Sequence, residues 1–312
     1  MAGDQLGVVV LTHGSGGPHE ALLEALTAER IEPDSIVVVH NPTEPGQAAP
    51  RVPAGCEVIQ AERNLGYAAG MNLGVARLLE RGSGFLLLLT HDARFEPGAL
   101  DALTGAARRR PEYGVLGPAL VLAGSGAPFS FGGVSGRNGT TWHLKDRPPA
   151  ADGIADCDWV DGGSLLVRAE VFERVGSFDE RFWGYCEESD LCLRARRAGW
   201  KVGAVLDAVA EQQPGADARP GVWSYLLTRN GAEYARRAVG LRGAAFVELR
   251  ACWTVAFNLV RVGARVVRPR PGGPRVPWLF AVGTARGAVD FLRRRWGPPP
   301  RSLPGMGDVR NL

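Results

Sequence analysis

The chain has 312 residues, of which 45% are hydrophobic, enough for one large packed domain or one domain with an appendage. Its five cysteines form no C-x-x-C pair, which excludes a disulfide scaffold and a structural zinc site and is typical of reduced cytoplasmic thiols. No run reaches the roughly 18 uninterrupted apolar residues of a membrane span, and no signal-peptide pattern opens the chain.

Charge divides the chain into two unequal parts. Residues 229–312 contain 16 Arg against four acidic residues, a balance of +12, while the first 228 residues hold 20 basic and 29 acidic groups, a balance of −9. We therefore treat the C-terminal part as a separate electrostatic unit.

The first 121 residues alternate apolar strands with helical patterns. Strands are predicted at 7–12, 35–40, 57–60 and 85–90, and helices around 22–26, from Gly66 and from about Pro97. This order predicts an α/β domain with a mostly parallel twisted sheet flanked by helices on both faces. Ligands are expected beyond the carboxyl ends of the strands.

The pattern changes in the next hundred residues. We predict a strand at 115–121, a hairpin within 129–143, a strand at 159–167, a short helix at 169–175 and a strand at 201–206. A break at 212–220 precedes the basic region. The chain is therefore divided into residues 1–220, with halves 1–121 and 122–220, and a basic amphipathic helical region, 221–312.

An acidic cluster opens one Arg-rich helix. Glu187, Glu188 and Asp190 follow an aromatic loop at 182–185. The dipole and the unpaired N–H groups of a helix N-terminus stabilise carboxylates, which favours the ionised form that a general base needs. The aromatic loop suits the apolar face of a sugar ring. The alternative is an ordinary amphipathic helix with an acidic first turn.

Four segments around this cluster occur in a characteristic order: WVDGG at 159–163, GSFDE at 176–180, EESDL at 187–191 and RRAGW at 196–200. They resemble the acceptor half of family 2 inverting glycosyltransferases with the GT-A (nucleotide-diphospho-sugar transferase) fold, of the rhamnosyltransferase type. The resemblance implies that Glu188 deprotonates the acceptor hydroxyl, with Glu187 and Asp190 orienting it. It also implies an acceptor pocket lined by Trp159, Asp161, Gly162, Gly163 and Trp183.

The segment NLGYAAGMNLG at 64–74 is similar to the family run N-x-G-x-x-x-G-x-N-x-G, which lies against the nucleotide. Glycine permits close backbone approach, and Asn offers amide groups to base and phosphate. The resemblance implies donor contacts from Thr12, His40, Asn41, Asn64, Gly66, Asn72, His91 and Asp92. Two alternatives stay open: the glycines pack a helix on the sheet, and His40 is a structural hydrogen-bond donor.

A metal site is expected where a buried strand ends at Asp92. Carboxylate oxygens suit Mg²⁺ or Mn²⁺, which would bridge the donor's phosphates. The family usually has an acidic or Asn residue where Thr90 stands and a His where Gln212 stands, so we expect Glu211 as the second ligand. The alternative is that Asp92 is a helix cap or turn residue.

These features predict transfer of a sugar from a dTDP-, UDP- or GDP-sugar to a hydroxyl of a glycan, lipid-linked or natural-product acceptor, with inversion. The residues at His40, Thr90, Glu188 and Gln212 depart from the family pattern. The alternative function is therefore a fold that has lost catalysis and serves as a sugar-nucleotide-binding or partner subunit.

The basic region contains two apolar patches, 251–260 and 276–292, the first bracketed by Arg250 and Arg261. Arg at the edges of an apolar face is typical of helices in a membrane interface with anionic lipid. We expect a cytoplasmic protein held peripherally at the inner face of the plasma membrane. The alternatives are a helix pair packed on the domain and a homodimer contact. No nucleic-acid partner is expected, because no nucleic-acid motif accompanies the Arg residues.

Overall fold

The computed structural model describes residues 3–14, 19–44, 46–212, 219–268 and 273–304. Its strands are β1 (Leu6–His13), β2 (Ile36–Asn41), β3 (Glu57–Gln60), β4 (Phe85–Thr90), β5 (Arg94–Phe95), β6 (Tyr113–Leu122), β7 (Pro128–Ser130), β8 (Gly133–Ser135), β9 (Thr141–His143), β10 (Ile154–Asp156), β11 (Ser164–Arg168) and β12 (Lys201–Gln212). Its helices are α1 (His19–Ala28), a 3₁₀ turn (Pro33–Ser35), α2 (Gly66–Glu80), α3 (Ala99–Arg109), α4 (Ala169–Val175), α5 (Glu187–Arg197), α6 (Pro220–Val239), α7 (Leu241–Val267) and α8 (Arg275–Leu292).

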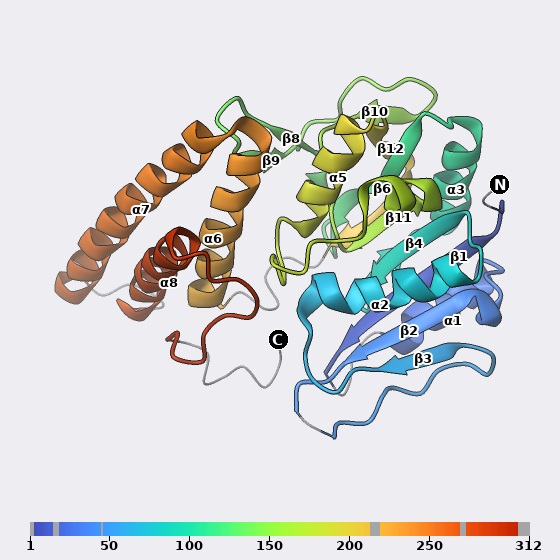
Figure 1. The fold of residues 1–312 in the computed structure, drawn as a ribbon, viewed down its shortest axis with the longest axis horizontal. Coiled ribbons are helices and arrows are strands. Elements are labelled where there is room, and N and C mark those ends of the chain that lie inside the picture. Colours follow the sequence, from blue (N-terminus) through green and yellow to red (C-terminus); the bar gives the residue numbers. More distant parts are fainter. Residues whose placement is uncertain (1–2, 15–18, 45, 213–218, 269–272, 305–312) are drawn as a thin grey trace.

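Within the described residues, a ten-stranded sheet forms the centre of the larger body (Figure 1). Its order is β10-β12-β6-β11-β4-β1-β2-β3, with β5 paired to β12 and β7 to β6. Strands β3, β2, β1 and β4 are parallel, as are β6 and β12, whereas β11 runs antiparallel between β4 and β6. The predicted mostly parallel α/β sheet is confirmed.

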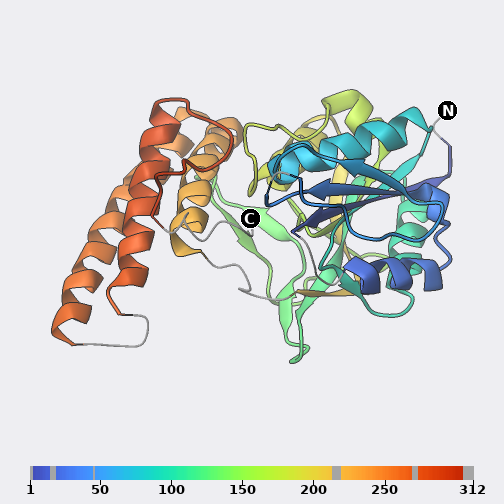
Figure 2. The same cartoon turned by 90° about the horizontal axis from the view of Figure 1, so that it is seen from below.

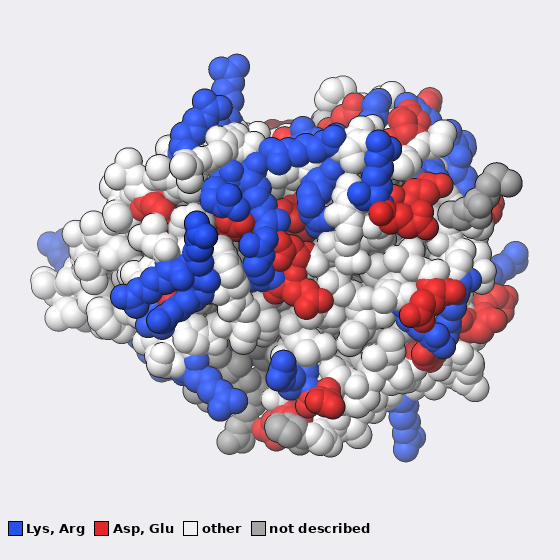
Figure 3. All heavy atoms as spheres, viewed as in Figure 1, with Lys and Arg blue, Asp and Glu red and all other residues white. Residues whose placement is uncertain are grey.

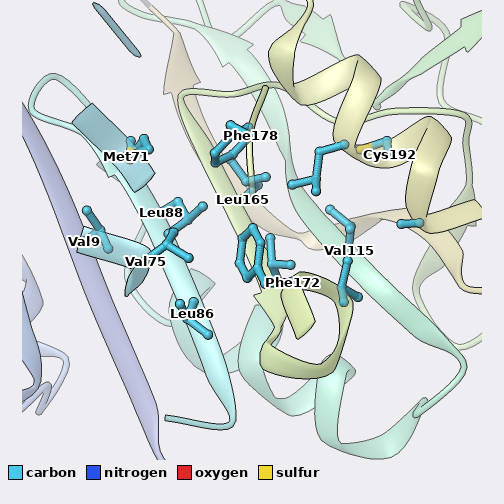
Figure 4. Close-up of a cluster of buried hydrophobic side chains, with 14 of the residues drawn as sticks. Val9, Met71, Val75, Leu86, Leu88, Val115, Leu165, Phe172, Phe178 and Cys192 are labelled. Carbon is cyan, nitrogen blue, oxygen red and sulfur yellow. The ribbon is translucent and has the colours of Figure 1, made fainter. Parts of the chain in front are cut away.

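The central strands are nearly continuous apolar runs because both faces of the sheet are covered. Helices α2, α4 and α5 pack on one face, and α1 and α3 pack on the other. Figure 4 shows the first of these cores, where Met71 and Val75 of α2 lie over Val9 and Leu88 of the strands. Burying each such side chain stabilises the folded state by roughly 1.5–3 kcal/mol relative to leaving it exposed.

The predicted elements of the first half agree with the structure within two residues at most strand ends. The strand predicted at 159–167 is wrong in its first half: β11 begins at Ser164, and Trp159 makes only an isolated bridge to Gly133. The strand predicted at 201–206 continues instead to Gln212. A register shift between Val205 and Val209 carries it past the exposed Asp207. Most of the predicted break, residues 213–218, lies outside the described part.

The C-terminal helices form a smaller body beside the sheet domain (Figures 1 and 2). Helix α6 lies between α8 and the sheet domain, and α7 packs on both α6 and α8. The α6–α8 crossing is close because glycines face it: a Cβ on Gly283 would lie 2.1 Å from the carbonyl oxygen of Gly221. The predicted C-terminal helices are therefore present, and they are joined to the sheet domain through α6.

Candidate active site

The loop before α5 has an unusual backbone. Trp183, Tyr185 and Cys186 all have positive φ angles, of 63°, 67° and 72°. Such conformations cost on the order of 1–3 kcal/mol each for residues other than glycine, and they persist only where surrounding contacts enforce them. The loop therefore has a fixed shape that must be supported from outside.

The support comes from helix α6. The fully buried Asn230 donates its side-chain amide to the carbonyl oxygens of Phe182 (2.8 Å), Gly184 (2.7 Å) and Tyr185 (2.9 Å). Arg229 donates to the Phe182 carbonyl as well, at 3.2 Å. The aromatic loop is thus held in place by two neighbouring side chains 40 to 50 residues further along the chain.

Glu188 lies at the junction of α5 with the 161–163 segment. A Cβ on Gly162 would contact the Cβ of Glu188 at 3.6 Å, and Ser189 Oγ donates to Glu188 Oε1 at 3.1 Å. Burial raises the pKa of Glu188 to about 7, and the charge of Asp161 adds to the rise. This differs from the expectation that the helix N-terminus keeps the group ionised, because desolvation outweighs the dipole here.

Glu187 lies deeper than Glu188. It is only 4% exposed, and burial followed by the charge of Glu188 raises its pKa well above the ordinary range. Burial and the neighbouring charge thus favour the protonated form of Glu187. Two adjacent buried carboxyl groups do not both ionise readily, so a neutral Glu187 leaves the negative charge to Glu188.

Asp190 belongs to an ion-pair cluster. It is fully buried and accepts hydrogen bonds from Arg194 Nε (2.8 Å) and Arg237 Nη1 (2.7 Å). Arg237 also donates to Asp179 at 2.6 Å and to Glu233 at 2.9 Å. One oxygen of Asp190 thus pairs with Arg194 within α5 and the other joins α5 to Arg237 of α6, which favours a role in positioning the helix over contact with a substrate.

The acceptor-side residue Asp161 is held by two residues that the sequence reasoning missed. Ser130 Oγ donates to Asp161 Oδ2 at 2.8 Å, and His143 Nδ1 lies 3.0 Å from Ser130 Oγ and 3.5 Å from Asp161 Oδ1. The His143 ring lies 4.9 Å from that of Trp159 and 5.0 Å from that of Phe129. Burial raises the pKa of Asp161, and His143 opposes the rise.

Trp159 packs against this cluster through its contact with His143. It is 5% exposed, and its indole Nε1 donates to the Val134 carbonyl at 3.4 Å. The sequence signal that could have identified His143 and Ser130 is the Gly-rich aromatic hairpin, but nothing local indicated that its side chains reach Asp161. Trp159 is thus a buried residue that packs behind the acceptor side and is not exposed to a substrate.

The predicted donor and acceptor residues meet at the start of α2. The backbone N–H of Tyr67 donates to the Trp183 carbonyl at 2.7 Å, and the Tyr67 hydroxyl donates to the Gly162 carbonyl at 2.5 Å. At the end of β4, the Thr90 N–H donates to the Gly163 carbonyl at 3.0 Å. The residues expected to line the acceptor pocket therefore touch the elements expected to bind the donor.

The glycines of the 64–74 run are occupied by packing. A Cβ on Gly66 would lie 2.4 Å from the Trp183 carbonyl oxygen, one on Gly70 2.6 Å from Leu11, and one on Gly74 2.4 Å from Val9. These contacts favour the interpretation in which the glycines let α2 lie close to β1 and to the aromatic loop.

The asparagines of the donor side also bind within the protein. Asn72 Nδ2 donates to the Phe178 carbonyl at 2.9 Å and its Oδ1 accepts from the Phe178 N–H at 3.0 Å. Asn41 Nδ2 donates to the Gly66 carbonyl at 2.8 Å, and Asn64 Oδ1 accepts from the Gly66 N–H at 2.8 Å. These amides build the frame of the donor side.

Thr12 and His40 form a buried pair at the adjacent ends of β1 and β2. Thr12 Oγ1 lies 2.9 Å from His40 Nδ1, and the two residues are 2% and 0% exposed. The structural alternative for His40 is therefore favoured.

A small hollow at the ends of β4 and β12 gathers the expected metal ligands. It is lined by Thr90, Asp92, Gly163, Glu211 and Gln212, and His91 adjoins it. Among the described residues no three His, Cys, Asp or Glu side chains cluster as a closed metal site. Two carboxylates in an open hollow nevertheless fit Mg²⁺ or Mn²⁺, which commonly bind one or two protein carboxylates and complete their shell with phosphates and water.

A wider cavity, about 600 Å³, lies near the other end of α5. Arg196, Trp200 and Lys201 line it. Two ion pairs join lining residues, Arg196 to Asp158 (2.6 Å) and Lys201 to Asp156 (4.0 Å). None of the residues predicted for the site lines this cavity. This cavity is therefore separate from the predicted site residues.

Comparison with known proteins finds relatives both in sequence and in fold. No model of a protein family matches the chain. The chain is 31% identical over 225 residues to N-acetylglucosaminyl-diphospho-decaprenol L-rhamnosyltransferase of Mycobacterium tuberculosis, covering 63% of this chain and 72% of that protein.

Two solved structures share the fold at low identity. Mannosyltransferase PcManGT of Pyrobaculum calidifontis, in complex with GDP-Man and Mn²⁺, superposes with a TM-score of 0.50 at 13% identity, covering 93% of this chain and 88% of that one. GalNAc-T7 with UDP, GalNAc and Mn²⁺ superposes with a TM-score of 0.54 at 12% identity, covering 95% of this chain and 58% of that one.

Proposed function

Because the chain belongs to the rhamnosyltransferase-like glycosyltransferases of the GT-A fold, we propose that it transfers a deoxyhexose such as rhamnose from a nucleotide-diphosphate donor to a hydroxyl of a lipid-linked glycan. The protein is a glycosyltransferase, an enzyme of class EC 2.4. The lipid-linked acceptor is supported by the name of the mycobacterial relative, whose substrate is a decaprenol diphosphate sugar.

The observation that carries the proposal is the position of Glu188 where the two halves meet. A carboxylate with a pKa of about 7 is half ionised at neutral pH, which suits a general base. Glu188 accepts the proton of the acceptor hydroxyl, and the hydroxyl oxygen attacks the anomeric carbon of the donor sugar. The bond from that carbon to the diphosphate breaks on the opposite side, the nucleoside diphosphate leaves with the electron pair, and the configuration inverts.

The neighbours of Glu188 support its proposed role as the general base. Burial favours the neutral form of Glu187, which adds no second negative charge, and Tyr67 donates to the Gly162 carbonyl beside Glu188. Asp161, held by Ser130, adds negative charge on the acceptor side and raises the affinity of Glu188 for a proton. We assign Asp161, Gly162, Gly163 and Trp183 to the walls of the acceptor pocket and Trp159 to the packing behind it.

The donor diphosphate would lie at the hollow formed by β4 and β12. Asp92 and Glu211 would hold Mg²⁺ or Mn²⁺, which when bound neutralises the charge of the diphosphate. The Mn²⁺ in the two structures of similar fold supports this assignment. The nucleoside would extend over the ends of β1 and β2, where Thr12, His40 and Asn41 form the base of the site and Asn64, Gly66 and Asn72 fix its rim.

A lipid-linked acceptor also implies where the protein works. The saccharide of such a substrate lies at a membrane surface, so we propose that the protein acts peripherally at the inner face of the plasma membrane. The basic C-terminal region is the part proposed to meet that surface.

The test is a transfer assay with the purified full chain, dTDP-, UDP- and GDP-sugars, Mn²⁺ and a synthetic short-chain prenyl-diphospho-N-acetylglucosamine acceptor. We expect mass spectrometry to detect one added deoxyhexose with a single nucleotide class. Glu188→Gln should abolish the product, and Glu173→Gln, an exposed acid on α4, should not.

A thermal-shift series with the same donors separates binding from transfer. A donor at 100 times its Kd should add about 2.7 kcal/mol of stability. Stabilisation by a donor with no transfer to any acceptor would favour a sugar-nucleotide-binding subunit and contradict the proposed reaction.

A further inference from the structure

Helix α7 carries an apolar stripe that the rest of the described protein leaves uncovered. Six of its large side chains recur at spacings of three, four or seven residues and therefore lie on one side of the helix. They are Phe246 (41% exposed), Leu249 (72%), Trp253 (67%), Phe257 (47%), Val260 (71%) and Val267 (79%). The rings of Trp253 and Phe257 stack with centroids 5.3 Å apart. We call these six residues the α7 stripe.

The opposite side of α7 already has its partners. Ala244, Ala251 and Asn258, spaced seven residues apart, are buried where α7 packs on α6 and α8. The packing of α7 on α6 and α8 is formed by these small residues, and the six residues of the α7 stripe are not buried in it. The α7 stripe therefore faces away from the protein. Figure 3 shows mostly uncharged atoms at the α7 end of this view, with basic side chains grouped nearer α8.

Arginines border one edge of the stripe. On a helix with 100° between successive residues, Arg250 and Arg261 fall side by side, next to the apolar residues, and Arg268 follows the end of the helix. The Arg261 guanidinium lies 5.7 Å from the centre of the Phe257 ring, so its stem follows the apolar surface while its charge reaches the edge. An apolar stripe with a cationic edge matches the boundary between lipid chains and anionic headgroups.

Among the described helices, α7 is the one whose length and apolar composition would allow it to cross a membrane. Its charges argue against crossing. Only ten residues separate Arg250 from Arg261. At 1.5 Å per residue they cover roughly 15 Å, about half of a ~30 Å hydrocarbon core. An orientation in the plane of the surface leaves Arg250 and Arg261 in contact with headgroups and water.

The charge also argues against a second copy of this chain as the occupant. Residues 229–312 have a net charge of +12, and a symmetric contact would place this part of one copy against the same part of the other. Anionic lipid is complementary to that charge.

We propose that the α7 stripe and its arginine edge form an in-plane docking surface for an anionic lipid bilayer. The proposal deepens the proposed function, since a lipid-linked acceptor must be reached at such a surface. Helix α6 connects the two sites: it packs on α7 and α8 and, through Asn230, holds the aromatic loop before Glu188. Docking therefore sets a fixed orientation of the acceptor pocket toward the bilayer.

The test measures sedimentation of the full chain with vesicles of phosphatidylcholine alone and of phosphatidylcholine with an equal amount of phosphatidylglycerol. No donor or acceptor is present, so failure of the proposed reaction cannot affect it. We expect at least about tenfold stronger binding to the anionic vesicles, lost at high salt. Equal binding to both vesicles would contradict the arginine edge.

Two sets of variants locate the surface. The triple variant Trp253→Ser, Phe257→Ser and Val260→Ser should weaken binding at least about tenfold. Its control, Val58→Ser, Leu73→Ser and Trp142→Ser, alters three exposed apolar residues elsewhere and should bind normally.

The charge variant Arg250→Gln with Arg261→Gln should weaken binding roughly tenfold or more, whereas Arg109→Gln with Arg174→Gln should not. A triple variant that binds like the unmodified chain would overturn the proposal. So would light scattering that shows a dimer, dissociated by the triple variant, with no binding to either vesicle, because the occupant would then be a second copy.

Discussion

The backbone carbonyl of Trp183 lies where a side chain on Gly66 would begin: a Cβ there would be 2.4 Å from its oxygen. The same oxygen accepts the N–H of Tyr67 at 2.7 Å. The start of α2, on the donor side, and the aromatic loop of the acceptor side therefore share a hydrogen bond that only glycine at position 66 permits.

Gly66→Ala should destabilise the protein by about 2–4 kcal/mol, because positive φ strain and a clash with Trp183 add together. Gly82→Ala is the matched control: its φ is also positive, at 78°, but no atom lies within 4 Å of the new methyl group. Urea denaturation of the two variants measures the difference. Equal losses would show that the contact with Trp183 is unimportant.

Glu188→Gln should lower kcat by a factor of about 10²–10⁴ while leaving donor binding intact, because it removes the general base without changing its volume. Glu188→Asp tests the reach of the group and should retain more activity than the Gln variant. Initial rates and donor thermal shifts distinguish these effects. Full activity of Glu188→Gln would exclude the residue as base.

The rate of transfer should rise with pH through about 7, since Glu188 acts when ionised and its pKa is about 7. Asp161→Asn should move the midpoint of kcat/KM to lower pH, because the charge of Asp161 raises the pKa of Glu188. The control is Asp101→Asn on α3, which should leave the midpoint unchanged. An unmoved midpoint in Asp161→Asn would mean that the two carboxyl groups do not interact.

The raised pKa of Glu188 also makes the stability of the protein depend on pH. Burial raises the pKa of Glu188 above that of the unfolded chain, near 4.3, so its contribution to stability is lost as pH rises from about 4.3 to about 7. Compared with the unmodified chain, Glu188→Gln should therefore gain stability as pH increases across this window. Thermal unfolding at a series of pH values measures the gain, and parallel curves for the two proteins would contradict it.

Asp190→Asn should cost about 3–5 kcal/mol of stability, because it leaves Arg194 and Arg237 without their shared buried carboxylate. The exposed pair between Asp4 and Arg108 provides the control, and Asp4→Asn should change stability by less than about 1 kcal/mol. If Asp190 instead contacted the reacting atoms, its variant would lose activity at temperatures where it remains folded.

Local sequence determined much of this fold. The apolar runs of β1, β2 and β4 predict buried parallel strands, and the acidic residues from Glu187 predict the start of α5, because strand and helix periodicity depend on neighbours along the chain. The order of short motifs from Trp159 onward was sufficient to indicate the family. The strand expected from Trp159 failed because apolar content alone does not show where pairing with β4 begins.

Tertiary structure alone decided the state of the site. Ser130 and His143 reach Asp161 from a separate hairpin, and Asn230 holds the aromatic loop from α6. No local pattern encodes such distant hydrogen bonds. The pKa of Glu188 follows the same rule: the helix dipole belongs to its own segment, but the desolvation that overcomes it comes from the chain folded around it.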